Sequence, residues 1–235
     1  QGILRYAVLR LGWKTDEGVL TLVTGKRDVP QIEALAERVQ QLDPRITTVA
    51  QNINPRATNA ILGGETRILR GPQHMTDELL GCTFCISPTA FYQTNPQQTE
   101  LLYQLAIDGM ALRDGDVLMD AYCGSGTIGL CAAAGAREAG RAIKLFGVER
   151  NPAGGERVDV LSIDPPRAGS TPEFLDAAVA LAPRRIVYVS CNPETQVRDL
   201  EQLLSNGYGL ESITPVDMFP HTMHVETVAV LERRG

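Results

Sequence analysis

Cys191 is the residue in this sequence best suited to covalent chemistry. It follows the apolar, β-type run 185–189 and precedes Asn192-Pro193, a pair typical of the start of a helix. A cysteine at the carboxyl end of a parallel strand lies where open α/β sheets bind their ligands. The dipole of the following helix would stabilise a thiolate there, which favours a nucleophile. The alternative is a small buried residue that ends the strand, since free cysteine is often buried.

Residues 120–126, Asp-Ala-Tyr-Cys-Gly-Ser-Gly, form a loop between a predicted strand and a predicted helix. Its glycines, Gly124 among them, let a ligand approach the backbone, although such loops also serve as plain tight turns. The loop matches neither a dinucleotide-binding nor a phosphate-binding motif. Glu149 ends the next predicted strand, where a carboxylate can accept hydrogen bonds from ribose hydroxyls. Together they indicate an adenosine-containing ligand without a pyrophosphate, such as S-adenosylmethionine.

Two carboxylates accompany later strands. Asp164 follows the predicted strand 158–163, and the two prolines after it force an extended path. Such a carboxylate can accept a hydrogen bond from a nucleobase N–H, or it can simply end the strand. Glu226 is a lone carboxylate in the apolar final strand, which is unusual unless the residue is edge-exposed or functional. A buried glutamate has a raised pKa and could act as a general base near neutral pH.

An aromatic residue and an amide precede a long predicted helix that begins at Pro96. Phe91 and Gln93 suit stacking on, and hydrogen bonding to, a nucleobase or cofactor. Core aromatics of a strand would have the same spacing, so both interpretations stay open here.

The elements that position these residues change character along the chain. Residues 5–69 alternate between strand-like pairs and one helix at 30–42; the predicted strands 46–53 and 60–69 follow, the second broken by a Gly63-Gly64 hairpin turn. From about residue 96, strands alternate with helices, which predicts a doubly wound, Rossmann-like α/β sheet. The last two strands could add an antiparallel edge. We therefore expect a small α+β domain at 1–95 and a larger domain at 96–235.

The connection from Glu149 to Val158 is too short to join two parallel strands through a helix. Only residues 150–157 separate the two predicted strands, and the Pro-Ala-Gly-Gly sequence within them cannot supply a helix. A crossover between parallel strands needs at least about 10–12 residues including its helix. Either the two strands are antiparallel or residues are missing between Arg150 and Val158, and the second interpretation is favoured.

Composition sets limits on partners and location. The 235 residues carry a formal net charge of −6, so the chain lacks the overall excess of positive charge that is typical of nucleic-acid-binding proteins. A local cluster of positive side chains can nevertheless bind nucleic acid in a protein that is acidic overall. Five cysteines, an odd number, favour a reducing compartment, so cytoplasm is expected. No apolar run approaches the roughly 18 residues of a membrane span, and no membrane partner is expected. Candidate cationic clusters are Arg167, Arg184 and Arg185, and Arg5, Arg10, Lys14, Lys26 and Arg27.

Cys82 and Cys85 have the spacing of half a zinc site. A second pair of ligands is not evident among the other cysteines and the three histidines. In a strand, side chains three residues apart point to opposite faces, and no four-cysteine iron–sulfur pattern is present. We expect neither a metal ion nor an iron–sulfur cluster.

Taken in order, these segments resemble the S-adenosylmethionine-dependent RNA uracil-5-methyltransferases, specifically the bacterial 23S rRNA branch. The resemblance covers about residues 60–235, and the ordered set is far more specific than any one segment. The five segments are Phe91-Tyr92-Gln93, residues 120–126, Asp164-Pro165-Pro166-Arg167, Ser190-Cys191-Asn192-Pro193 and His224-Val225-Glu226.

The resemblance implies a role for each candidate residue. Cys191 would attack C6 of the target uracil, C5 would then take the methyl group, and Glu226 would remove the C5 proton. Cofactor binding is implied for Gln93, Tyr122, Gly124, Glu149 and Asp164, and Asp164 and Phe91 would also lie near the uracil. The domain at 1–95 would contact RNA. The target base must leave its stack to reach such a site.

Three departures from the family pattern are evident. The family usually carries an N-terminal oligonucleotide-binding β-barrel before the segment that corresponds to this chain. Some branches have an upstream four-cysteine cluster. The family also has a helix, a strand and a second helix between the segments matching Glu149 and Val158, in agreement with the length argument above.

Three alternatives remain at this stage. The same residues could modify a uridine of tRNA, because they do not set the RNA target. A cytosine-5-methyltransferase shares the attack on C6 but usually carries Pro-Cys rather than Ser-Cys-Asn-Pro. A non-catalytic RNA- or adenosine-binding module would bind the cofactor without forming a covalent adduct.

Overall fold

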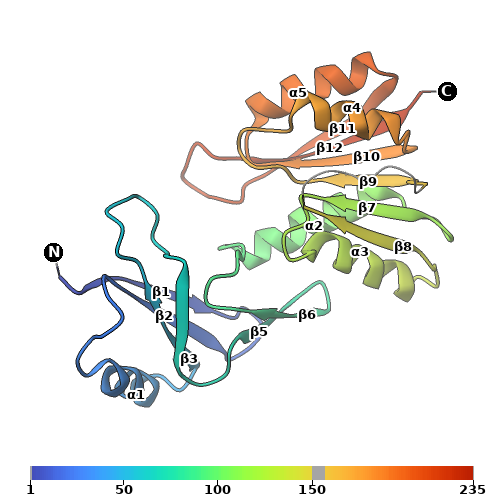
Figure 1. The fold of residues 1–235 in the computed structure, drawn as a ribbon. Helices are drawn as coiled ribbons and strands as arrows, with labels where there is room; N and C mark the ends of the chain where they lie inside the picture. The colour runs from blue at the N-terminus through green and yellow to red at the C-terminus, as the bar shows by residue number, and fades with distance from the viewer. Residues whose placement is uncertain (1, 150–156, 235) are drawn as a thin grey trace. The chain divides into compact units, whose positions relative to one another are not determined.

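The computed structural model describes residues 2–149 and 157–234. The chain divides into two compact units, Gln1–Tyr92 and Gln93–Gly235. Each unit is built around its own main sheet (Figure 1). Among the described residues, none of the helices combines the length and the apolar character needed to cross a membrane.

The first unit has a four-stranded sheet, one helix and a separate hairpin. The sheet order is β1-β2-β3-β4, with β2 parallel to β3 and the outer pairs antiparallel. The parallel pair is joined through α1, whose Ile32 and Ala36 pack with Leu22 and Val49 of the sheet. The elements are β1 (Leu4–Leu11), β2 (Gly18–Thr24), α1 (Ile32–Leu42), β3 (Ile46–Ile53), β4 (Glu65–Arg70) and the hairpin strands β5 (Met75–Leu79) and β6 (Cys82–Ile86).

The predicted strand 60–69 is confirmed only in its second part, and its hairpin turn at Gly63-Gly64 is wrong. β4 begins at Glu65, and Gly63 lies against β3. The Gly63 N–H donates to Asn52 Oδ1 at 2.7 Å, and its carbonyl accepts from Asn52 Nδ2 at 3.1 Å. A Cβ atom on Gly63 would lie 2.0 Å from the carbonyl oxygen of Ile53. The glycine therefore permits a close approach to β3 rather than a turn.

The second unit is the predicted doubly wound α/β fold. Its six-stranded sheet has the order β11-β12-β10-β9-β7-β8. The last two strands, β11 and β12, are antiparallel to each other, and β12 is also antiparallel to β10. The elements are α2 (Pro96–Met110), β7 (Val117–Ala121), α3 (Thr127–Glu138), β8 (Lys144–Val148), β9 (Val160–Ile163), α4 (Pro172–Ala180), β10 (Arg185–Ser190), α5 (Pro193–Ser205), β11 (Tyr208–Val216) and β12 (Glu226–Arg233).

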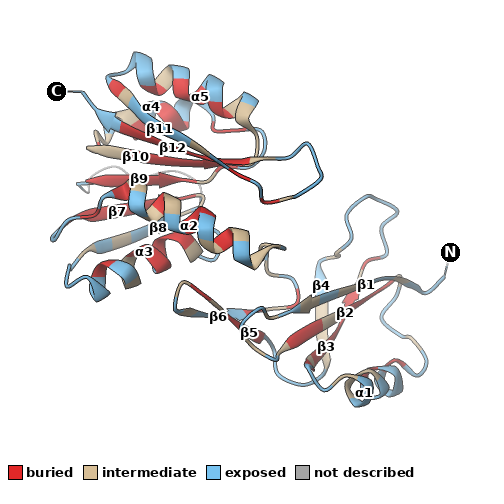
Figure 2. Ribbon diagram, turned by 180° about the vertical axis from the view of Figure 1, so that it is seen from behind, coloured by how far each residue is buried: buried red, intermediate tan, exposed pale blue. Residues whose placement is uncertain are grey.

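Helices cover both faces of this sheet. Every residue of β7 and β9 is buried, as expected for central strands with no face left to solvent (Figure 2). α2 packs against α3, and α4 packs against α5. A core cluster joins Phe174 and Leu175 of α4, Leu200 and Leu203 of α5, and Ile186 of β10.

The order of the strands reverses beside β7. β8 lies parallel to β7 on one side, and β9 lies parallel to it on the other. Open α/β sheets bind ligands at the carboxyl ends of the strands at such a switch point. The segments singled out by sequence, at 122–126, Glu149, Asp164 and Cys191, all follow these carboxyl ends.

Because β8 and β9 are both parallel to β7, the antiparallel explanation for their short connection is wrong. The favoured explanation places missing residues between Arg150 and Val158. Residues 150–156 lie outside the described part of the chain, so that expectation stays a prediction.

Candidate active site

The glycine-containing loop 122–126 leaves β7 in a tightly held conformation. Tyr122 has a φ of 60°, in the left-handed region, and its N–H donates to the Val148 carbonyl at 2.8 Å. The Tyr122 ring packs on Phe174 of α4, with ring centroids 4.8 Å apart. Gly124 is exposed, and a Cβ atom there would lie 3.9 Å from Glu149 Oε1. The structure thus brings Tyr122, Gly124 and Glu149 together, as predicted.

Asp120 fixes the start of the helix after this loop. Its carboxylate is 2% exposed and accepts the N–H of Gly129 in α3 at 3.0 Å. Burial raises the pKa of Asp120 to about 6. Sequence reasoning treated Asp120 only as the first residue of the loop motif. Its position at the end of a fully apolar strand was the signal that marked a buried carboxylate.

Cys191 and Glu226 lie at the same end of two adjacent strands. β10 and β12 pair with Ser190 opposite Thr227. Cys191 immediately follows Ser190, and Glu226 immediately precedes Thr227, so the antiparallel register brings the two together. Glu226 is 6% exposed, and burial raises the pKa of its carboxyl.

The helix after Cys191 begins as predicted, at Pro193, with Asn192 Oδ1 accepting the N–H of Glu194 at 3.3 Å. The predicted stabilisation of a Cys191 thiolate by the helix is outweighed by other effects. Burial raises the pKa of the Cys191 thiol, and the carboxylates of Glu226 and Asp164 raise it further. The opposing effects, including that of the Arg167 guanidinium, are smaller. Cys191 is therefore a protonated thiol at neutral pH.

Asp164 completes the cluster at this edge of the sheet. Its N–H donates to the Ala121 carbonyl at 3.4 Å, which ties the end of β9 to the end of β7. Burial raises the pKa of Asp164 to about 7, and the charges of Glu226 and Asp120 contribute to the shift. A carboxyl with this pKa is available in both protonation states near neutral pH.

The cluster is continued by the loop before β12. Arg167 Nη2 lies 3.3 Å from His224 Nδ1, so the segments after β9 and before β12 meet. Asn95, at the start of α2, donates from its side chain to the Met218 carbonyl at 3.0 Å. Gln93 is half-buried just ahead of this anchor.

Phe91 belongs to the first unit and is 79% exposed. Its predicted role beside the uracil stays a prediction. Among residues 2–149 and 157–234, no group of three or more His, Cys, Asp or Glu side chains is arranged to hold a metal ion.

This geometry can be compared with known proteins. A family model described as tRNA (uracil-5-)-methyltransferase matches residues 156–234. An RNA methyltransferase of Lactiplantibacillus plantarum is 37% identical over 266 residues, covering 99% of this chain and 57% of that protein. One of Lactobacillus johnsonii is 40% identical over 260 residues, covering 99% of this chain and 58% of that protein. The solved structure of Pyrococcus abyssi tRNA (uracil-54, C5)-methyltransferase, in complex with S-adenosyl-L-homocysteine, is 28% identical with a TM-score of 0.77 and covers 98% of this chain and 60% of that one.

Across almost its whole length the chain is similar to RNA methyltransferases, and its residues 156–234 match the uracil-5-methyltransferase family model. It spans a little more than half the length of the RNA methyltransferases it matches, 57% and 58% in the two bacterial proteins. The first of these matches runs over 266 residues, more than the 235 of this chain, so that RNA methyltransferase has internal residues for which this chain has no counterpart.

Proposed function

We propose that this chain transfers a methyl group from S-adenosylmethionine to C5 of a uridine in RNA. The main support is the register of β10 and β12, which brings a cysteine and a buried glutamate to one strand end. Asp164 follows the neighbouring strand β9 at the same edge. A nucleophile that reaches C6 and a base that reaches the adjacent C5 of one ring are what substitution at C5 requires.

The residues around loop 122–126 fit the methyl donor. Gly124 leaves the backbone open, and the exposed Glu149 carboxylate lies beside it as an acceptor for ribose hydroxyls. Gln93, Tyr122 and Asp164 are the other proposed binding residues. When bound, S-adenosylmethionine supplies an electrophilic methyl group on a sulfonium centre.

Cys191 starts the proposed reaction. Its thiol first loses its proton to water, the thiolate sulfur forms a bond to C6 of the uracil, and the electron pair of the C5–C6 double bond moves into the ring as an enolate. This makes C5 nucleophilic, which it is not in free uracil. Asp164 contacts the base: its ionised carboxylate can accept the ring N–H, and its protonated form can donate to the carbonyl on which charge develops.

Glu226 ends the reaction. After C5 has gained the methyl group, the Glu226 carboxylate accepts the C5 proton. The electron pair re-forms the C5–C6 double bond, and the bond from Cys191 to C6 breaks. The raised pKa of Glu226 makes its carboxylate a stronger base than an exposed glutamate.

RNA that contains 5-fluorouridine tests the proposal. Fluorine at C5 cannot leave as a proton, so the methylated adduct should remain attached to Cys191 and migrate as a protein–RNA band in denaturing gels. RNA containing 5-fluorocytidine should give no such band. A band with 5-fluorocytidine only would instead indicate a cytosine-5-methyltransferase. Cofactor binding without any band would indicate a non-catalytic module.

The proposed substrate is 23S rRNA, from the sequence resemblance, with Phe91 and the first unit contacting the RNA. A tRNA uridine is the second candidate, because the matching family model and the Pyrococcus abyssi enzyme are both named for tRNA. Methylation assays with separate rRNA and tRNA, followed by mass mapping of 5-methyluridine, distinguish them. Incorporation into tRNA alone would contradict the first choice.

A further inference from the structure

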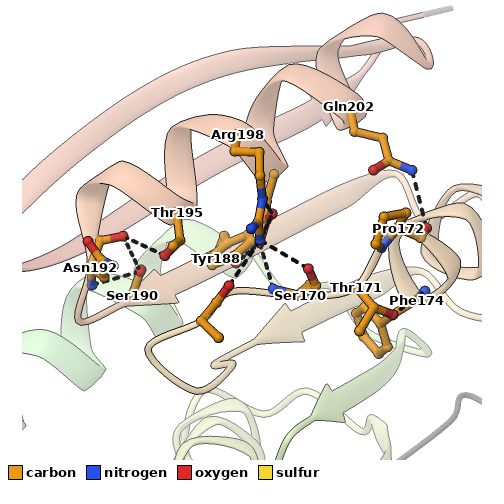
Figure 3. A network of polar contacts seen from close by, with 12 residues as sticks. Ser170, Thr171, Pro172, Phe174, Tyr188, Ser190, Asn192, Thr195, Arg198 and Gln202 are labelled. Carbon is orange, nitrogen blue, oxygen red and sulfur yellow. Dashed lines mark hydrogen bonds and ion pairs between the residues drawn. The ribbon is translucent and has the colours of Figure 1, made fainter.

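The connection between β9 and α4, residues 164–171, lies along α5, the helix that begins just after Cys191 (Figure 3). The Arg167 carbonyl accepts from Asn192 Nδ2 at 3.2 Å and from Thr195 Oγ1 at 3.3 Å. Asn192 is the N-cap of that helix, and Thr195 lies in its first turn. The backbone three residues after Asp164 is therefore fixed to the segment that carries Cys191.

A buried carboxylate on α5 holds the second half of this connection. Asp199 is 1% exposed, and its Oδ2 accepts the Ser170 N–H at 2.7 Å and the Tyr188 hydroxyl at 2.5 Å. Its Oδ1 accepts from Arg198 Nη2 at 2.7 Å. The same Arg198 guanidinium donates to the carbonyls of Ala168 at 3.0 Å and Ser170 at 3.2 Å. A buried carboxylate is stable only with such a full set of donors.

The contact is close enough to require a glycine in the connection. Gly169 has a φ of +79°, and a Cβ atom there would lie 2.5 Å from Arg198 Nη2 and 2.7 Å from Asp199 Oδ2. The connection thus rests directly on the Arg198–Asp199 pair, with no room for a side chain between them.

About one turn earlier on the same buried face, α5 is also tied to the strand that carries Glu226. Gln196 is 2% exposed; its Nε2 donates to the Tyr188 carbonyl at 3.0 Å, and its Oε1 accepts the Thr227 hydroxyl at 2.8 Å. Thr227 directly follows Glu226. One helix therefore contacts the Thr227 side chain next to Glu226 and the backbone at Arg167, three residues after Asp164.

We propose that Asp199 and Gln196 are positioning residues, through which α5 holds the Asp164 connection and the Glu226 strand in place around Cys191. This inference rests on the proposed function. Asp199 governs the attack of Cys191, because Asp164 contacts the base during that step. Gln196 governs release, because Glu226 acts only after the methyl group has been added.

Two variants on the same helix separate these roles. Asp199→Ala should slow adduct formation with saturating 5-fluorouridine RNA by about 100-fold, the effect expected of a displacement of about 1 Å. Asp199→Asn keeps an oxygen acceptor for Ser170 and Tyr188 and should restore most of the rate. Gln196→Met should form the adduct within about 3-fold of the normal rate but release methylated, unfluorinated RNA about 10-fold more slowly.

Two further variants distinguish an effect on positioning from a loss of folding. Thr195→Val removes only the hydroxyl that donates to the Arg167 carbonyl near the helix surface, and it should slow adduct formation by about 5-fold. Gln202→Ala is the matched control, because Gln202 lies on the same helix but bonds to Pro172 and Asp176 of α4 instead. It should leave both rates unchanged.

The inference is tested by comparing how each variant changes the rate of adduct formation and the rate of release. A purely structural role would lower the active fraction and reduce both rates by one factor in each variant. That result, or normal rates in Asp199→Ala and Gln196→Met, would overturn the inference. Absence of any adduct with the unsubstituted full-length protein would overturn the proposed function itself, and this inference with it.

Discussion

At the scale of single residues, the site is defined by carboxylates that oppose ionisation of their neighbours. Asp164 and Glu226 both raise the pKa of the Cys191 thiol, and Glu226 also raises the pKa of Asp164. Types and spacing in the sequence identified all three residues. The raised pKa of Glu226 was expected from burial, whereas the protonated state of Cys191 could not be predicted, because it depends on burial and on charges that come from the ends of other strands.

Cys191→Ala should abolish the covalent adduct with 5-fluorouridine RNA, because the sulfur that bonds to C6 is removed. Its affinity for S-adenosylmethionine, measured by calorimetric titration, should change by less than about 3-fold, since the proposed donor site lies at loop 122–126. An adduct that persists in this variant would show that Cys191 is not the nucleophile.

Glu226→Gln should accumulate the methylated adduct on ordinary, unfluorinated RNA. An amide cannot accept the C5 proton, and general-base removal typically contributes about 10²–10⁴-fold. Denaturing gels of a single-turnover reaction would show the retained band. Prompt release from this variant would count against Glu226 as the base.

Asp164 makes stability depend on pH. Its pKa in the folded protein is about 7, above the ordinary value of 3.8, so the folded state binds the proton more tightly than the unfolded state. This contribution is fully present below the unfolded value and is lost as the pH rises through about 7. Asp164→Asn should therefore be more stable than the parent at pH 8 and nearly equal at pH 4.

Thermal unfolding measures this difference. A gain of about 1 kcal/mol at pH 8 would raise Tm by about 2–4 °C in a chain of this size. Glu201→Gln, an exposed carboxylate on α5, is the control and should show no such pH-dependent gain. An equal shift at both pH values would indicate a packing effect rather than titration.

At the scale of elements, local signals predicted helix starts well. Pro96, Pro172 and Pro193 each lie in the first turn of a helix, after a capping Asn95, Thr171 or Asn192. The interactions behind these signals join residues only a few positions apart, so the local sequence is enough to predict them. Gly63 is different, because the need for a glycine there arises from its contacts with Asn52 and Ile53 of β3, which are distant in sequence.

Gly169 gives a test of how tightly one element rests on another. Gly169→Ala should cost about 1–2 kcal/mol for the left-handed backbone and about 1–3 kcal/mol more for the clash with Arg198 and Asp199. Gly115→Ala is matched for backbone conformation, with a φ of +80° and no atom within 4 Å of the added Cβ. Urea denaturation of both variants isolates the clash, and equal losses would show that the contact is loose.

At the scale of the whole molecule, alternation of strands and helices predicted the doubly wound sheet, and the antiparallel β11–β12 pair was anticipated as well. The helix contacts were not predictable. Asp199 and Gln196 lie in a polar stretch of α5 whose sequence resembles an ordinary solvated face, and only the packing of α5 on the sheet buries them. Charge is also unevenly divided: carboxylates exceed cations in the second unit, whereas the first unit is nearly balanced.

The pairing of β10 with β12 also makes the distance between the reacting side chains independent of the length of the segment that joins β11 to β12. Cys191 and Glu226 are brought together by strand pairing, so their separation does not depend on the path that the chain takes between β11 and β12. The exposed residues 220–223 could therefore change in number without separating Cys191 from Glu226, whereas the buried Met218, which accepts from Asn95, could not be lost so easily.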